Sequence, residues 1–209
     1  DVTTHHIIRF VLDTLEVYTL NYSFESIFSY LNAAFVNIDP GDICMLQNYI
    51  ECTGIGRAAW LDSTRWNKTA DKYFKDNTVL KKRVCKIRDT YILPLISMHE
   101  KIKGRHTVSE NMTALYRFPA DVTELPQTIS QYIEKFTEIG NLRYAKEYEQ
   151  IWNLLSDTFD DIVYVCGERK VSPAEFLKIL GTAFSQHKIG YIPNGLDKII
   201  VGNTERTRI

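Results

Sequence analysis

Apolar residues recur at intervals of three and four along most of the chain, which is the spacing of an α-helix with one buried face. The first such stretch predicts a helix built on Ile7, Ile8, Val11, Leu12, Leu15 and Tyr18. A second helix is predicted from Phe24 to Leu31, with Ser23 as its N-cap. The pattern therefore indicates a mostly α-helical chain.

Cap residues predict where further helices begin. Asp39 is followed by Pro40 at the first helical position, and Gly54 is a suitable end for that helix. Residues 107–110 read Thr-Val-Ser-Glu, which is a capping box. Residues 172–175, Ser-Pro-Ala-Glu, combine a cap, a proline and a glutamate at the third helical position. We expect the last of these helices to end near position 187.

Other stretches carry weaker signals. Between positions 54 and 78 the periodicity fails, which predicts a long loop pinned by Trp60, Trp66, Tyr73 and Phe74. A long helix is expected from Val79 to Lys103, kinked by Pro94 and stopped by Gly104. Two more amphipathic helices are predicted at 125–139 and 142–165.

The last residues change character. Residues 192–195 read as a turn, and the apolar run at 196–201 reads as a strand. Since the rest of the chain offers no convincing partner strand, and since the chain opens on Asp1, we expect a segment of a longer protein. In that interpretation the final strand belongs to a sheet whose other strands lie elsewhere.

Composition restricts the class of protein. With 44% hydrophobic and 24% charged residues the chain is expected to fold, and 209 residues suffice for a core without metal or disulfide. No signal peptide and no apolar run of about 20 residues is present, which favours a cytoplasmic, non-membrane protein. The cysteines, which form no CxxC pair, are expected to be buried free thiols: Cys44, Cys52, Cys85 and Cys166.

Motifs for catalysis are missing from the sequence. It has no GxxxxGK[ST] phosphate loop and no GxGxxG, HExxH or GxSxG pattern, so no catalytic, cofactor or metal residue is assigned. His5 and His6 are adjacent on a predicted helix and are not expected to share a face. Asp157 and Asp161 are expected on a solvated helix face.

Charge is distributed unevenly along the chain. Residues 79–106 hold eight basic and two acidic groups, whereas residues 107–180 hold seven basic and twelve acidic groups. Within the basic segment, Lys82 and Lys86 fall on one helical side and could neutralise DNA phosphates without reading sequence. Arg206 and Arg208, alternating after the predicted strand, are further candidates for phosphate contact. A plain solvated helix face is the alternative.

Three longer patterns carry a family resemblance. Residues 22–31, YSFESIFSYL, resemble the Y-x-x-E-x-x-F-x-Y-L segment of AddB/RexB subunits. LQNYI at 46–50, followed by Gly-Ile at 54–55 and a tryptophan at 60, is similar to a second segment of that family. IGYIP at 189–193 and LDKIIVGNTERTR at 196–208 resemble a third. The patterns occur in the family's order, although Asn-Ala at 32–33 replaces the usual lysine and threonine.

The resemblance implies a function for the parent protein. AddB/RexB proteins are B subunits of bacterial ATP-dependent helicase-nucleases, which act with an A subunit on broken DNA ends for recombinational repair. It implies that ATP, magnesium and an iron-sulfur cluster are bound outside this segment.

The resemblance also implies a fold. Residues 1–190 would form a helical accessory domain, 2B-like, of a superfamily 1-type helicase-like subunit, and residues 191–209 would begin the returning motor-like core as a short β segment. The chain itself would act as scaffold and DNA-path element. The alternative is a free-standing helical protein-interaction domain that uses the aromatic residues between Trp60 and Phe74 as its surface.

Overall fold

The computed structural model describes residues 2–123 and 125–187, and most of them are helical. The longer helices are α1 (His6–Thr19), α2 (Phe24–Leu31), α3 (Pro40–Thr53), α5 (Ser63–Phe74), α6 (Thr78–Ile87), α7 (Leu93–Ile102), α8 (Val108–Val122), α9 (Leu125–Glu138), α10 (Leu142–Cys166) and α11 (Pro173–Ser185). The short elements are η1 (Val2–Thr4), α4 (Ala58–Leu61), the π-helical turn η2 (Arg88–Ile92) and strands β1 (His106–Thr107) and β2 (Lys170–Val171). The predicted mostly helical character is confirmed.

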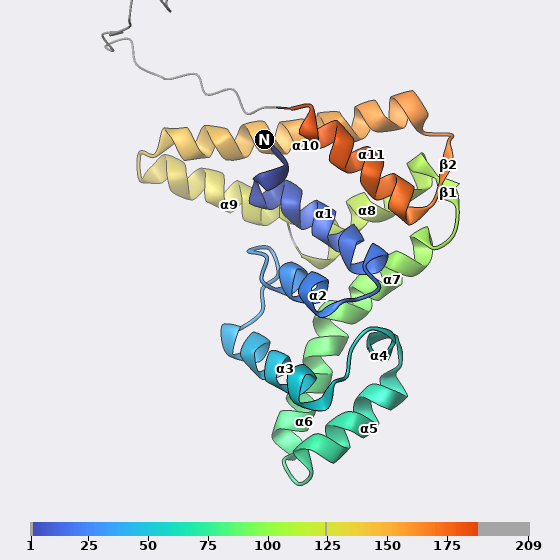
Figure 1. Ribbon diagram of the computed structural model, residues 1–209. Helices are drawn as coiled ribbons and strands as arrows, with labels where there is room; N and C mark the ends of the chain where they lie inside the picture. Colours follow the sequence, from blue (N-terminus) through green and yellow to red (C-terminus); the bar gives the residue numbers. More distant parts are fainter. Residues whose placement is uncertain (1, 124, 188–209) are drawn as a thin grey trace, which may run out of the picture.

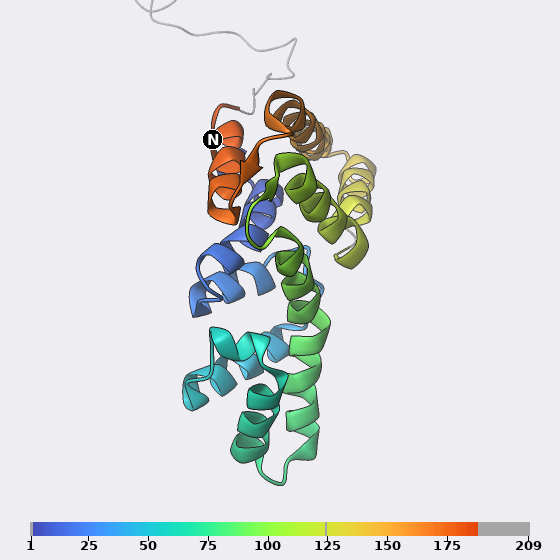
Figure 2. The same ribbon diagram turned by 90° about the vertical axis from the view of Figure 1, so that its right-hand side faces the viewer.

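The helices are arranged in two groups, one at each end of an elongated molecule (Figure 1). One group holds α1 and α8 to α11, and the other holds α3 to α6. The continuous helical run α6–η2–α7 passes along one side from the second group to the first, as Figure 2 shows. One hydrophobic core cluster extends through both groups. The two ends therefore belong to a single packed body.

The predicted helix caps are confirmed. The Asp39 carboxylate accepts hydrogen bonds from the backbone at the start of α3, and Gly54 ends that helix with φ +63°. Thr107 and Ser172 each form a full capping box, with Glu110 and Glu175 respectively. These contacts are local in sequence, so the chain specifies them without tertiary help.

The loop predicted at 54–78 is wrong. This stretch contains α4 and the twelve-residue α5, whose N-cap Asp62 accepts a hydrogen bond from the backbone N–H of Arg65. Trp66 and Ala70, four residues apart, are both fully buried and form the apolar face of α5. Trp66, Ala70 and Phe74 recur every four residues, so the helical spacing is present in the sequence, although the apolar stripe is narrow because most other residues of α5 are polar.

The long helix predicted at 79–103 is largely confirmed, with a different irregularity. The run stays helical, but residues Arg88–Ile92 adopt π-helical geometry just before Pro94. A π-turn relieves the steric conflict of a proline with the preceding turn.

A small sheet was not predicted. β1 and β2 pair antiparallel, with His106 opposite Val171 and Thr107 opposite Lys170. Each strand leads into a capping box, so the pairing aligns the starts of α8 and α11. The expected turn at 192–195, the strand at 196–201 and the domain boundary at 190–191 lie outside the described residues, and so do Arg206 and Arg208.

The cysteines are free, as predicted, but none of them is buried. Cys44 and Cys52 are exposed, and Cys85 and Cys166 are partly exposed. The Cys85 thiol donates a hydrogen bond to the Asn67 side chain over 3.2 Å, and partial burial raises its pKa. Within the described ranges no three His, Cys, Asp or Glu side chains are placed to hold a metal ion.

Candidate nucleic-acid interface

The antiparallel helices α5 and α6 form the end of the molecule farthest from α10 and α11 (Figure 1). Residues 63–87, which span both helices, hold eight basic and two acidic groups. Trp66 and Ala70 of α5 and Val84 and Ile87 of α6 are buried, so the polar residues of both helices are directed outward. The hairpin therefore presents a strongly basic surface at one tip.

Some of the basic groups on α6 are held by other side chains. Lys81 forms an ion pair with Asp71 of α5, and Arg83 forms one with Asp42 of α3. These ion pairs connect α6 to α5 and α3, and they neutralise part of the positive charge of α6.

Arg88 is not available to a ligand at all. Only 2% of it is exposed, and its guanidinium donates hydrogen bonds to the Trp60 carbonyl oxygen from Nε (3.0 Å) and Nη2 (2.7 Å). It also lies 5.9 Å from the Trp66 ring centroid. This arginine of the basic segment has a structural role.

Lys82 and Lys86, the phosphate candidates on α6, are exposed on the side of α6 that faces solvent. The described part of the chain offers neither of them an ion-pair partner. Their accessibility is as the sequence predicted, and contact with DNA stays a prediction.

A second basic stripe lies on α5 and was missed because the region was predicted to be a loop. Arg65, Lys68 and Lys72 follow each other at intervals of three and four, so they share one helix face, and all three are exposed. They border a shallow hollow of about 350 Å³. None of the three has an ion-pair partner among residues 2–123 and 125–187. The spacing alone would have identified this stripe if the helix had been recognised.

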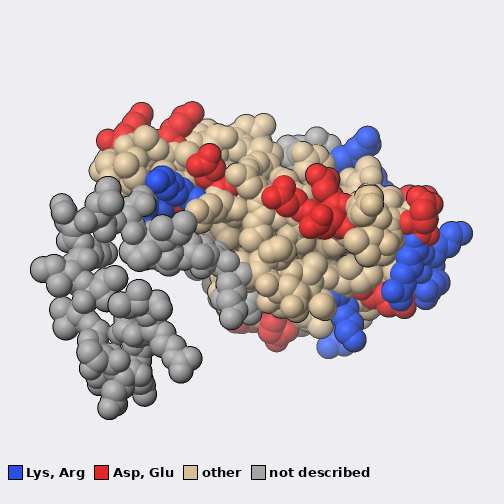
Figure 3. Space-filling model, turned by 90° about the horizontal axis from the view of Figure 1, so that it is seen from above, with Lys and Arg blue, Asp and Glu red and all other residues tan. Residues whose placement is uncertain are grey.

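The other end of the molecule has a different charge pattern. Seen from above, Asp and Glu side chains are interspersed among Lys and Arg side chains (Figure 3). Asp157 and Asp161 are exposed on α10, which confirms the predicted solvated face, and Asp160 beside them is exposed as well. Near the sheet, Arg105 pairs with Glu175 over 3.2 Å. Because acidic and basic groups alternate at that end, the α5–α6 tip is better suited to bind an anion than the surface formed by α10 and α11.

Two of the aromatic residues considered above as an interaction surface, Trp60 and Trp66, lie in the core instead. Trp60 and Trp66 are 1% and 0% exposed, with ring centroids 4.6 Å apart, and Tyr49 of α3 packs against Trp66. Both indoles are therefore core residues and are not available to a partner, whereas Tyr73 is 40% exposed.

None of the helices in the described ranges is long and apolar enough to cross a membrane. No family model matches the chain. It is, however, similar over its whole length to several curated proteins, each of which is named as the B subunit of an ATP-dependent helicase/deoxyribonuclease.

Three of these relatives illustrate the match. Identity is 34% over 213 residues for the protein of Acetivibrio thermocellus, 35% over 212 residues for that of Clostridium botulinum (Loch Maree), and 32% over 215 residues for that of Caldanaerobacter subterraneus. In each case the match covers 100% of this chain and 18% of the relative. The chain spans about a fifth of the length of these relatives. It belongs, as a segment, to the AddB-type family of ATP-dependent helicase/deoxyribonuclease B subunits.

Proposed function

We propose that this chain is a helical scaffold and DNA-path element of the B subunit of a bacterial helicase-nuclease, and that its α5–α6 tip contacts the DNA backbone. The parent protein would process double-strand breaks for recombinational repair in the cytoplasm, together with an A subunit. By the family resemblance alone, ATP, magnesium and any iron-sulfur cluster would be bound by other parts of the parent protein.

One observation carries the DNA contact. Five exposed cations on two adjacent helices have no acidic partner in the described part of the chain: Arg65, Lys68, Lys72, Lys82 and Lys86. Phosphate oxygens are the natural partners of such groups, and contacts of this kind position a protein on DNA without reading its sequence. The accessory-domain assignment within a superfamily 1-type protein rests on the family resemblance and belongs to the same proposal.

The test is the affinity of the 209-residue chain for a fluorescent forked DNA, measured by anisotropy at several salt concentrations. Affinity should be weak and should fall as salt rises, with a slope of about −0.9 per phosphate contacted. The double variant Lys82→Glu/Lys86→Glu should bind about tenfold more weakly and show a flatter slope. Arg65→Glu/Lys72→Glu should act in the same way.

A matched control changes the same charge elsewhere. Lys146 on α10 and Lys178 on α11 lie in the other helix group, so Lys146→Glu/Lys178→Glu should bind nearly as tightly as the parent. If the control variant lost as much DNA affinity as Lys82→Glu/Lys86→Glu, binding would depend on net charge alone and not on the α5–α6 tip. Absence of binding at low salt, or binding insensitive to salt, would remove the proposed DNA path. ATPase or nuclease activity of this chain alone would contradict the scaffold role.

A further inference from the structure

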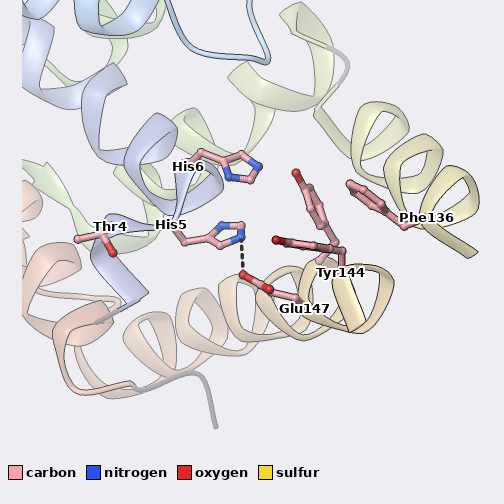
Figure 4. Close-up of a pocket in the computed structure, with 7 residues that line it drawn as sticks. Thr4, His5, His6, Phe136, Tyr144 and Glu147 are labelled. Atoms are coloured by element: carbon pink, nitrogen blue, oxygen red, sulfur yellow. Dashed lines mark ion pairs between the residues drawn. The ribbon is translucent and has the colours of Figure 1, made fainter. Parts of the chain in front are cut away.

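A pocket of about 450 Å³ lies between the start of α1 and the α9–α10 hairpin, far from the basic tip. Its lining consists of Thr4, His5, His6, Phe136, Tyr144, Glu147 and Tyr148. Figure 4 shows the side chains of His5 and His6 on one side of this space and those of Phe136, Tyr144 and Glu147 on the other, with Glu147 opposite His5. Tertiary packing therefore joins residues that are about 130 or more positions apart in the sequence.

Aromatic rings form most of the wall. Phe136 stacks on Tyr144 with centroids 5.4 Å apart and planes at 29°, and Tyr148 lies 5.6 Å from Phe136. His6 lies 5.2 Å from Tyr148 and 4.3 Å from His5, on which it stacks. The expectation that the two histidines would not share a face is thus wrong, because His5 precedes α1 as its N-cap and is free of helical geometry.

Glu147 is the one acidic group of the lining. Its carboxylate lies 3.9 Å from His5 Nε2, a pair that is ionic only when the imidazole is protonated. Burial, with His6 beside it, lowers the pKa of His5 to about 4, and burial also lowers the pKa of His6. Both rings are therefore neutral at pH 7, and the lining contains no cation that offsets the carboxylate.

A carboxylate beside the electron-rich faces of aromatic rings attracts a cation and repels phosphate. A guanidinium suits this site better than an ammonium because it is planar, stacks on rings and binds carboxylates through two parallel hydrogen bonds. The Tyr144 ring already lies beneath one guanidinium, that of Arg143, at 5.8 Å from the centroid. A guanidinium inside the pocket would pair with the Glu147 carboxylate and lie beside the rings of Phe136 and Tyr148.

The exposed tip of the α9–α10 hairpin, next to Phe136 and Tyr144 in the sequence, indicates that the guanidinium belongs to a protein partner. At the hairpin tip Ile139, Leu142 and Tyr144 are 64%, 55% and 44% exposed. Exposed apolar side chains grouped beside a pocket are typical of protein-binding surfaces, in which arginine is a frequent anchor. From the pocket and its apolar rim we propose that the α9–α10 hairpin docks a protein partner and that the pocket between Glu147 and the rings of Phe136, Tyr144 and Tyr148 receives an arginine side chain of that partner.

The probe is Nα-acetylarginine methylamide, titrated into the 209-residue chain while the NMR signals of its Tyr and His rings are followed. The signals of His5, His6, Tyr144 and Tyr148 should shift and saturate with a Kd in the millimolar range, as for one small anchor. Glu147→Gln keeps the shape and removes the charge, so it should weaken binding about fivefold or more. Glu149→Gln, which changes an exposed carboxylate two residues along α10, should leave the affinity unchanged.

Two further ligands separate the alternatives. Nα-acetylnorleucine methylamide has a similar length and no charge, and should bind clearly more weakly. Equal binding of norleucine would make the pocket merely apolar, and equal binding by Glu147→Gln would remove the carboxylate from recognition. A thymidine oligonucleotide that shifts the same ring signals more strongly would make this a nucleic-acid site. Any of these three results would overturn the proposed arginine site, and so would the absence of saturable shifts. None of them would bear on the proposed DNA contact at the α5–α6 tip.

Discussion

The Tyr22 hydroxyl donates a hydrogen bond to Nδ1 of His99 over 2.9 Å, although 77 residues separate them. On the other side of the imidazole, Nε2 lies 2.6 Å from the Thr14 carbonyl oxygen and donates to it. His99 is 0% exposed. Both ring nitrogens are thus satisfied by a neutral ring, which joins α7 to α1 and to the segment before α2.

This arrangement predicts that stability falls as pH is lowered from 6.5 to 4. Burial lowers the pKa of His99 from 6.5 to about 4, so in this window the unfolded chain binds a proton that the folded chain does not. The contribution of His99 is complete above pH 6.5, and about 3 kcal/mol of unfolding free energy should be lost through this one group on reaching pH 4. Urea unfolding at a series of pH values measures this loss.

The variant His99→Gln serves as the control for that experiment, because glutamine can keep one donor and one acceptor without titrating. Its unfolding free energy should change less between pH 6.5 and 4 than that of the parent. A smaller dependence should remain, because burial also lowers the pKa values of His5 and His6. Identical slopes in the two proteins would contradict the assignment to His99.

Arg88 is predicted to be a stability residue. Replacing it with methionine leaves the buried Trp60 carbonyl without its two donors, so the unfolding free energy should fall by about 2 to 4 kcal/mol. Arg83, whose side chain is 49% exposed in its pair with Asp42, is the comparison. Arg83→Met should cost less than about 1 kcal/mol. Similar losses in both variants would show that burial does not distinguish these arginines.

Gly167 is predicted to tolerate no side chain. An added Cβ would collide with the Val163 carbonyl oxygen and lie 2.6 Å from Ser109 Oγ, where α10 meets the start of α8. Gly167→Ala should therefore lower the unfolding free energy by about 1 to 3 kcal/mol. Gly181 lies inside α11 with nothing within 4 Å of its Cβ position. Gly181→Ala should instead stabilise the chain by up to about 1 kcal/mol, and the opposite order of the two thermal midpoints would refute the argument.

Lys75 links stability to the proposed DNA contact. It ends α5 with φ 45° and ψ −107°, a conformation that glycine adopts without strain. Lys75→Gly should raise the unfolding free energy by about 1 kcal/mol, whereas Lys72→Gly, inside α5, should lower it by about 1 kcal/mol. Both remove a cation from the tip, so both should weaken DNA binding in the anisotropy experiment. If Lys75→Gly strengthened DNA binding while Lys72→Gly weakened it, affinity would follow the stability of the chain and not the charge of the tip.

Local signals in the sequence were sufficient for most of the helices. The caps at Asp39, Thr107 and Ser172 act over three or four residues, and the confirmed helix starts follow from that short range. The exposure of Lys82 and Lys86 could be predicted for the same reason, since helical periodicity separates them from the buried Val84 and Ile87. The family, too, was recognisable from linear patterns, and the relatives confirm it.

Tertiary structure decided the rest. α5 has two buried residues, Trp66 and Ala70, and their burial depends on α3 and α6, which cover them. The hydrogen bonds of Arg88 to Trp60 and of His99 to Thr14 span 28 and 85 positions. The pocket beside Glu147 likewise needs α1 to pack near the α9–α10 hairpin. Periodicity and caps describe a residue's neighbours within one or two turns, whereas buried polar groups and pockets are defined by partners that only the packed chain brings within reach.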